Sequence, residues 1–401
     1  MDSETLTMRR LTFLLLFFCI TLHAQPWVPD YSHAPFQYGT VLNGADYWQN
    51  TSPQLCDLNG SEIIAASDDR TFESTVGNWV GVGTTTIVRS TVAHHTGSAS
   101  GLIAGIGDGT SNYAKLPSAA LGLRVINYKY TIEVWNQDIT TATALHLKIG
   151  TQTLTSATEA TGAFGKVVFN YQATASDTGA DLIVWMTTAT GGYIDDVSLT
   201  QAYDGMVVQI FKSSAINGSA NQGLFDLGVT SATLPRLFTR LAATTNSFDY
   251  LFNDNLASNG VVASGLVIPI NTWTVSILML DRTRNMTPYV GGAAGATFDI
   301  SIFGKMTGVG QITLGYKTPT ASANTFLNGL ESETQYVRFN NITPYATSIV
   351  AQISATKKCL PSYPNQVTGG GWWKWQNGGS DSWGLNPVNP VGGAYTTRVK
   401  Y

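Results

Sequence analysis

The chain has 401 residues, of which 43% are hydrophobic, 12% are charged and 40 are glycine. This length predicts two or three domains rather than one, and the apolar content excludes a disordered chain. The 22 lysines and arginines against 26 acidic residues give a net charge of −4, without the basic surplus that binds a phosphate backbone, so we expect no nucleic-acid partner. Charged residues are about half as frequent as in an average globular domain, which is typical of an extracellular β-protein.

The N-terminus has the three parts of a secretory signal peptide. Two arginines precede an apolar run from Leu11 to Leu22, and Ala24 follows it closely. The run is shorter than the roughly 20 residues of a membrane-spanning helix. We therefore expect residues 1–24 to be a signal peptide, with no permanent membrane anchor, and the protein to be secreted or at the cell surface. The alternative is a buried N-terminal strand or helix in a virion-surface component that is never exported.

Removal of the signal peptide would leave two cysteines, Cys56 and Cys359. In an oxidising compartment they could form one long-range disulfide that ties the N-terminal arm to the C-terminal segment. The two thiols are far apart in the sequence and no CxxC motif occurs, so a zinc site or a thiol-redox role has little support.

Almost all of the remaining chain alternates short runs of Val, Ile, Leu, Thr, Phe and Tyr with turns rich in Gly, Asn, Asp and Ser. This pattern predicts an all-β protein built from sandwiches or barrels. Clear strand-length runs occupy residues 130–135, 166–171, 181–186, 207–211 and 274–280. Only residues 346–355 suggest a short helix, and they could equally form a last strand.

Composition and strand spacing divide the chain into five segments. They are the signal peptide 1–24, an arm 25–67 rich in aromatic residues and proline, two strand-rich blocks 68–202 and 203–356, and a tail 357–401 rich in Gly and Trp. We predict two tandem antiparallel β-sandwiches (jelly rolls) with an irregular N-terminal arm and an irregular C-terminal tail.

The first block contains four motifs in a characteristic order: Thr71–Trp79, Thr96–Ala104, Tyr130–Trp135 and Gly192–Leu199. Their order and spacing resemble the jelly-roll carbohydrate-binding modules often appended to xylanases and glucanases. The resemblance implies the fold more strongly than the ligand, because one fold hosts unrelated roles.

The closing motif of the first block contains two adjacent carboxylates, Asp195 and Asp196. In a strand their side chains point to opposite faces, so one of them faces the interior of the sandwich, where a carboxylate needs a partner. The resemblance implies a structural calcium ion held by Asp195 together with Glu73. The alternative is that Asp195 caps a turn or accepts backbone N–H groups, with no metal.

Modules of this kind bind sugars by stacking aromatic rings on pyranose faces, with amide side chains bonded to the hydroxyl groups. The candidate ligand-binding residues are Trp135, Trp185, Tyr113 and Tyr171, with Asn136 and Gln137 as polar neighbours. For each aromatic residue the alternative is packing in the core, the commoner place for large rings. Trp79 is assigned to the core.

The second block contains the motifs Asn271–Asp281, Thr287–Gly292, Gln311–Gly315 and Phe326–Leu330 followed by Tyr336–Asn340. In this order they resemble the concanavalin-A-like or laminin-G-like sandwich. Within the second of them, Tyr289-Val-Gly-Gly292 predicts a hairpin turn in which glycine supplies positive φ.

The sequence offers little support for catalysis. Glycosidases of the sandwich class need paired carboxylates, arranged as Glu-x-Asp-x-x-Glu, and that motif is absent. Glu331 and Glu333 lie in what we interpret as a polar turn, and His94 and His95 lie in an exposed turn without a recognisable catalytic motif. We therefore expect no catalytic residues and no enzymatic activity.

Four tryptophans crowd the tail: Trp372, Trp373, Trp375 and Trp383. They either pack onto the second sandwich or the arm, which we favour, or present an aromatic surface to a glycan or partner. The two aromatic-rich ends of the chain are also expected to dock against each other.

These features together favour an exported, non-catalytic, adhesin-like protein that binds a polysaccharide or glycan. The alternative is a structural or assembly protein of a virion or cell surface, in which the same sandwiches form a homo-oligomer or a surface array. A glycoside hydrolase is the third and least favoured candidate.

Overall fold

The computed structural model describes residues 38–42, 47–53, 55–139, 144–158, 162–216, 218, 220–228, 235–255, 260–315, 324–325, 327, 329–374, 382, 385–386, 389–391 and 395–398. All of them belong to one compact unit, Tyr38–Val399. The predicted signal peptide and the tryptophans Trp375 and Trp383 lie outside the described residues. A helix long and apolar enough to cross a membrane does not occur in the described part of the chain.

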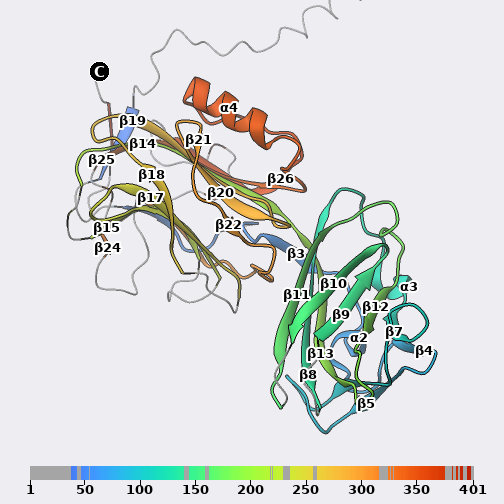
Figure 1. The fold of residues 1–401 in the computed structure, drawn as a ribbon. Coiled ribbons are helices and arrows are strands. Elements are labelled where there is room, and N and C mark those ends of the chain that lie inside the picture. The colour runs from blue at the N-terminus through green and yellow to red at the C-terminus, as the bar shows by residue number, and fades with distance from the viewer. Residues whose placement is uncertain are drawn as a thin grey trace, which may run out of the picture. The chain divides into compact units, whose positions relative to one another are not determined.

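Two sheets pack face to face in the first sandwich (Figure 1). One has the order β11-β8-β13-β6-β5 with β3 beside β13, and the other has the order β10-β9-β12-β7-β4. The strands of the first sheet are β3 (Asn59–Glu62), β5 (Thr86–Ser90), β6 (Ser100–Ala104), β8 (Lys129–Asp138), β11 (Gly165–Gln172) and β13 (Gly192–Ala202). Those of the second are β4 (Val80–Val82), β7 (Tyr113–Leu116), β9 (Ala144–Ile149), β10 (Gln152–Thr158) and β12 (Leu182–Trp185). Two single-turn helices, α2 (Asp68–Thr71) and α3 (Ser118–Leu121), lie in the connections.

The core of the first sandwich follows from the alternation of its strands. Along β8, Tyr130, Ile132 and Val134 point inward, where they meet Leu145 and Leu147 of β9. The predicted core residue Trp79 is 3% exposed and belongs to the same cluster. The apolar residues of β8 alternate with Thr131 and Glu133, which are buried as well, so in this strand the core face is marked by alternation of residue type.

The second sandwich also consists of two sheets. The strands of its larger sheet are β1 (Tyr38–Leu42), β14 (Asp204–Ser213), β19 (Trp273–Leu280), β20 (Asn285–Val290), β21 (Ala293–Ala294), β22 (Phe298–Asp299), β25 (Gly329–Phe339), β26 (Gln366–Lys374) and β28 (Tyr395–Arg398). The facing sheet has β2 (Tyr47–Asn50), β15 (Asn221–Gly228), β16 (Arg236–Leu241), β17 (Ser247–Asn253), β18 (Val262–Val267), β23 (Gln311–Leu314), β24 (Asn324–Thr325) and β27 (Asn389–Val391). Helix α4 (Ala346–Thr356), one of the two predicted forms of this segment, packs against β19. The all-β fold of two sandwiches is thereby confirmed.

The turn after β20 forms the predicted hairpin. Gly291 and Gly292 have φ angles of 56° and 91°, and β20 pairs with β21 across them. Both residues occupy the left-handed region that a tight hairpin turn requires and that glycine adopts without steric cost.

The described parts of the arm and the tail contain strands, whereas we predicted irregular segments. Strand β1 lies between β25 and β28, and β2 lies between β23 and β27, so both ends of the described chain are strands of the second sandwich. The expected docking of the two ends is therefore present as main-chain pairing. The first sandwich is inserted between β2 and β14 of the second. Trp372 and Trp373 of β26 are 8% and 0% exposed, which confirms packing for these two rings.

Buried polar contacts join the two sandwiches. Lys129 of β8 donates hydrogen bonds to Asp204 at 2.7 Å and to Asp281 at 2.6 Å, and neither Lys129 nor Asp204 has an exposed side chain. Burial raises the pKa of Asp204 to about 6, although Lys129 opposes that shift. The single ammonium of Lys129 faces both carboxylates, and this attraction offsets part of the cost of burying the charges in the interface.

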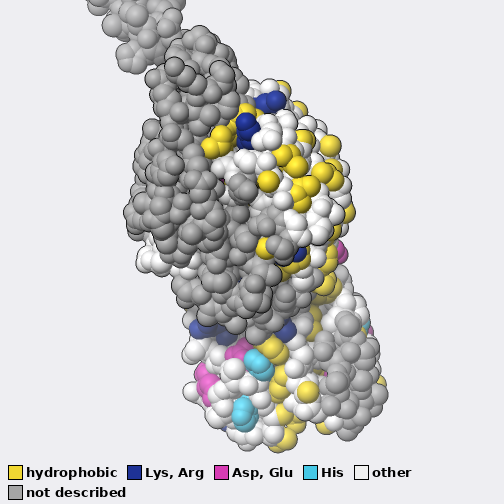
Figure 2. Space-filling view, turned by 90° about the vertical axis from the view of Figure 1, so that its left-hand side faces the viewer, with side chains coloured by type: hydrophobic (Ala, Val, Ile, Leu, Met, Phe, Trp, Pro, Cys, Tyr) yellow, Lys and Arg dark blue, Asp and Glu magenta, His cyan; other side chains and the backbone are white. Residues whose placement is uncertain are grey.

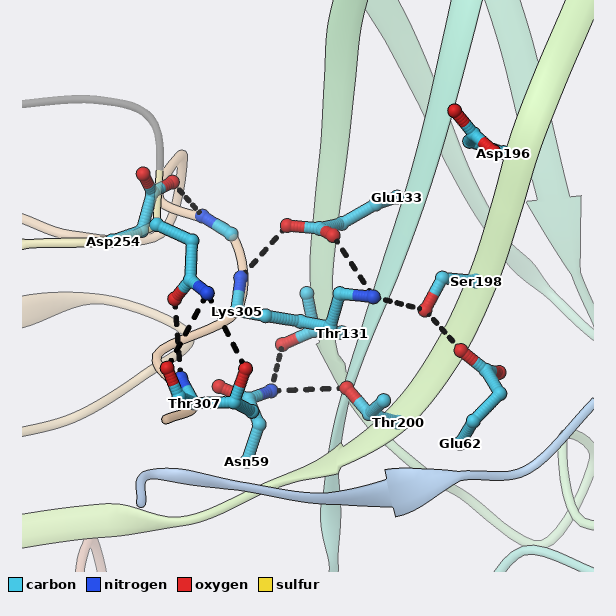
Figure 3. A network of polar contacts seen from close by, with 12 residues as sticks. Asn59, Glu62, Thr131, Glu133, Asp196, Ser198, Thr200, Asp254, Lys305 and Thr307 are labelled. Carbon is cyan, nitrogen blue, oxygen red and sulfur yellow. Dashed lines mark hydrogen bonds and ion pairs between the residues drawn. The ribbon is translucent and has the colours of Figure 1, made fainter. Parts of the chain in front are cut away.

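A second polar network lies beside it (Figure 3). The backbone N–H of Lys305 donates to Glu133 of β8 at 2.7 Å, and the Lys305 ammonium lies 3.4 Å from the same carboxylate. Asn59 of β3 donates to Thr131 and Thr200 and accepts from the N–H of Met306. These contacts hold the 299–307 loop of the second sandwich against the outer face of β8.

The predicted disulfide is absent. Cys56 and Cys359 are both buried and are not bonded to each other. The Cys56 carbonyl accepts a hydrogen bond from Tyr336, whereas the Cys359 N–H donates to Glu333. Since residues 333 and 336 of one strand point to opposite faces, the sheet separates the two thiols.

Glu331 and Glu333 lie in strand β25 and not in a polar turn. The pairing of β25 with β14 shifts register between them, and this irregularity turns the two side chains to opposite faces. Glu331 lies inside the second sandwich, where it accepts a hydrogen bond from Thr334, and burial raises its pKa to about 8. The two carboxylates therefore do not form a catalytic pair.

Candidate functional site

The outer face of the five-stranded sheet in the first sandwich carries side chains at half-exposed positions. Strand β9 shows why: Leu145, Leu147 and Ile149 are fully buried, and the alternate residues His146 and Lys148 point outward. The same alternation on β12 and β7 turns one aromatic residue of each strand to this face.

Four of these outward residues form a line across the sheet, which we call the aromatic row: Tyr113, Trp185, His146 and Thr155, on β7, β12, β9 and β10. His146 is paired in register with both Trp185 and Thr155. Ala114 pairs with Val184, so the register places Tyr113 beside Trp185. Four neighbouring strands at about 4.8 Å make the row about 14 Å long.

Contacts along the row fix the orientation of its rings. The His146 ring stacks on Trp185 with centroids 4.9 Å apart and planes 11° apart, and its Nδ1 lies 2.8 Å from the Thr155 hydroxyl. Burial lowers the pKa of His146, which favours the neutral imidazole. Trp185 is only 8% exposed, because the backbone at Gly109 lies against its ring. Trp185 is thus the support of the row, and Tyr113, His146 and Thr155 are its accessible members.

Trp135 and Gln137, two other predicted residues, lie on the outer face of β8 in the opposite sheet. The ring of His95 covers Trp135, with centroids 3.6 Å apart, and the His95 Nδ1 lies 2.7 Å from Asp196. Asp196 has a φ of 45°, which is uncommon for a residue other than glycine. Figure 2 shows histidine and acidic side chains near one another on the surface of the first sandwich. The His95 ring therefore covers one face of the Trp135 ring, and a sugar cannot stack on that face.

Tyr171 and Asn136 are wrong as ligand-binding residues. Tyr171 is 2% exposed within the core, and burial raises its pKa. Asn136 has no exposed surface, and its amide has no hydrogen-bond partner in the described part of the chain. Both side chains point into the sandwich, where a ligand on either outer face does not reach them.

The residues predicted to hold calcium are surrounded by hydrogen-bond donors. Asp195, with no exposed surface, accepts hydrogen bonds from the N–H groups of His95, Thr96 and Asp196. Glu73 accepts from the N–H and the hydroxyl of Ser98. No group of three His, Cys, Asp or Glu side chains that could hold a metal occurs among the residues that the structure covers. This donor set fits the alternative, a carboxylate bound by backbone N–H groups, better than it fits a cation, and calcium stays a prediction.

No family model matches the sequence, and no curated protein matches it either. Several solved structures are similar to parts of this chain. One is the CBM40 of the Ruminococcus gnavus IT-sialidase bound to α2,3-sialyllactose, with 16% identity over 32% of this chain and 74% of that one and a TM-score of 0.27. Another is the CBM22-1 xylan-binding domain of Paenibacillus barcinonensis Xyn10C, with 16% identity over 33% and 92% and a TM-score of 0.28. A third is the native heptameric SAP-like pentraxin of Limulus polyphemus, with 10% identity over 69% and 97% and a TM-score of 0.33.

Two residues of the outer face, His146 and Lys148, were not among the predicted site residues. The sequence Ala144-Leu-His-Leu-Lys-Ile149 alternates strictly, and this pattern alone places both on the polar face of a strand. What the sequence does not contain is the register that sets His146 beside Trp185.

Proposed function

We propose that the protein is a non-catalytic carbohydrate-binding protein and that the outer face with the aromatic row binds the glycan. The observation that carries this proposal is the line of Tyr113, Trp185 and His146 across three adjacent strands. Rings set in a line on an open sheet face offer an extended apolar strip with polar edges, which suits the faces and hydroxyl groups of successive sugar units.

Tyr113 and His146 have distinct roles in this proposal. The Tyr113 ring provides apolar area for a pyranose face, while its hydroxyl can bond to the sugar. His146, neutral and fixed by Trp185 and Thr155, offers the ring nitrogen that does not face Thr155 to a hydroxyl group. Because the His146 ring is held by stacking on Trp185 before the ligand arrives, it loses little conformational entropy on binding.

The cellular setting is part of the same proposal. The N-terminal arginines, the apolar run and Ala24 support export, so the protein would act as an adhesin-like component in the medium or at a cell surface.

A structural or assembly role is a second candidate, because one loop presents apolar side chains to solvent. Leu123 is 87% exposed, and Val125 and Ile126 are 50% and 49% exposed. The buried Arg124 between them is anchored by hydrogen bonds to backbone carbonyls, including that of Asp177. This role requires a second copy of the chain as the partner. Sedimentation would then show a dimer for the wild type and a monomer for Leu123→Ser.

The test of carbohydrate binding is a glycan array probed with the full chain that follows residue 24, with and without a calcium chelator. Each hit is then titrated with the variants Tyr113→Ala and His146→Ala, and we expect each to bind about tenfold more weakly, a loss of about 1.4 kcal/mol. His94→Ala is the matched control, because His94 is exposed in the same sandwich away from the row. Wild-type protein that binds no glycan, or row variants that bind like the control, would refute the proposal.

A further inference from the structure

A second row of side chains runs parallel to the aromatic row on the same face. Ile183 of β12 is paired in register with Lys115 on one side and with Lys148 on the other. Two lysines therefore flank an apolar residue, one strand spacing of about 4.8 Å away in each direction. Along β9, Lys148 lies two residues from His146, so it projects from the same face beside the aromatic row.

The two lysines differ in their partners. Lys115 lies 2.8 Å from Asp181, and this pair compensates its charge. Lys148 is half-exposed and has no carboxylate or hydrogen-bond partner in the part of the chain that the structure describes. Asp108, in the loop beside Trp185, directs its carboxylate at the N–H groups of residues 110–112. Lys148 thus adds a positive charge beside the rings that has no carboxylate partner among the described residues. Asp108, whose pKa is lowered by these N–H groups, keeps a negative charge in the neighbouring loop.

We propose that the outer face selects an acidic polysaccharide, one that carries carboxylate or sulfate groups, and that Lys148 is the residue that binds the anion. This inference depends on the proposed function of the aromatic row. The sugar ring packs against Tyr113 and His146, and the anionic substituent reaches Lys148 over Ile183. An ammonium–anion hydrogen bond is stronger than one between neutral groups, and the lysine head accepts either anion because it is a compact charge on a flexible stem.

The net charge of the chain does not oppose this binding. A value of −4 spread over 401 residues is weak at a distance, because salt screens exposed charges beyond about 8 Å at physiological ionic strength. Recognition then depends on the local charges of the face.

The experiment uses one array that holds neutral glycans such as dextran and mannan, uronate polymers such as polygalacturonate and hyaluronan, and dextran sulfate. We expect wild-type protein to bind acidic members, with affinity that falls as NaCl is raised. Lys148→Gln is expected to weaken binding of the acidic members about tenfold, the size of one charge-assisted hydrogen bond. Lys357→Gln, an exposed lysine of the second sandwich, is the matched control. Comparison of the uronate polymers with dextran sulfate shows whether the bound anion is a carboxylate or a sulfate.

The outcomes separate the two proposals. Binding of acidic glycans that Lys148→Gln weakens and the control does not supports both. Binding of neutral glycans only, or of acidic glycans that Lys148→Gln leaves unchanged, overturns the role of Lys148 while the aromatic row keeps its function. Absence of any binding, or binding that Tyr113→Ala leaves unchanged, refutes the proposed function and this inference with it.

Discussion

The burial of Glu331 inside the second sandwich can be tested directly by measuring how the stability of the protein depends on pH. Its carboxyl group lies fully buried between the two sheets, and burial raises its pKa from 4.5 to about 8. Since the folded pKa is above the unfolded one, the folded state holds a proton that the unfolded chain releases between these two values. The group therefore lowers the free energy of unfolding progressively as the pH rises from 4.5 to 8.

The size of the effect follows from the shift. A difference of about 3.5 pKa units corresponds to a loss of about 5 kcal/mol in the free energy of unfolding, at 1.36 kcal/mol per unit. The full loss is reached above pH 8, and there is no loss below pH 4.5. In Glu331→Gln the amide has the same shape, its carbonyl oxygen can still accept from Thr334, and it does not ionise. We expect the variant to gain stability relative to the wild type by up to about 1.4 kcal/mol per pH unit across this range.

The assay is urea unfolding followed by tryptophan fluorescence at pH 5, 6, 7, 8 and 9. Glu73→Gln is the control, because hydrogen bonds from Ser98 lower the pKa of Glu73, and its difference from the wild type should stay constant above pH 5. A stability difference between Glu331→Gln and the wild type that is the same at pH 5 and pH 8 would contradict the burial of a neutral carboxyl group at this position.

Three further outcomes are expected. Lys129→Met should lower the free energy of unfolding by about 3–5 kcal/mol, because it leaves Asp204 buried without its counter-charge; a loss below about 1 kcal/mol in the same urea assay would contradict a dry interface. Gly109→Ala should lower the melting temperature and weaken glycan binding, because its Cβ would lie 2.8 Å from the Trp185 ring at a φ of +67°; unchanged values in both measurements would show that the loop does not rest on the ring. Addition of EDTA should leave the melting temperature unchanged if Asp195 is satisfied by N–H groups, whereas a fall that calcium reverses would show a bound ion.

The local parts of this fold were predictable because each depends on a short pattern. Alternation over Tyr130–Trp135 places Ile132 and Val134 in the core, and the glycines after Tyr289 mark a turn. Tyr113 and Trp185 lie on the same outer face. Alternation within each strand places each residue on an outer face, but it does not decide that the two faces are the same. Such features need only the period of a strand and the chemistry of a turn.

The features that the sequence did not predict depend on residues distant in the chain. The arm and tail look irregular by composition. The arm forms β1 and β2 by pairing with β25 and β23, and the tail forms β28 and β27 by pairing with β1 and β2. Glu331 and Glu333 would share a face in a regular strand, but one register shift separates them. Tyr171 and Trp185 are both aromatic residues in strands, and which of them reaches an outer face depends on the register of neighbouring strands.

The insertion of the first sandwich between β2 and β14 has a consequence for synthesis. Strand β1 leaves the ribosome well before β28, because Tyr38 pairs with Arg398, which is made 360 residues later. At 5–20 residues per second, β1 and β2 wait roughly 20 to 70 seconds for β28 and β27. The first sandwich can complete its core during this delay, while the edges of the second stay open. A chain that stops short of β27 leaves strand edges unpaired, which favours aggregation, so premature termination is a greater hazard here than in two sandwiches that follow one another along the chain.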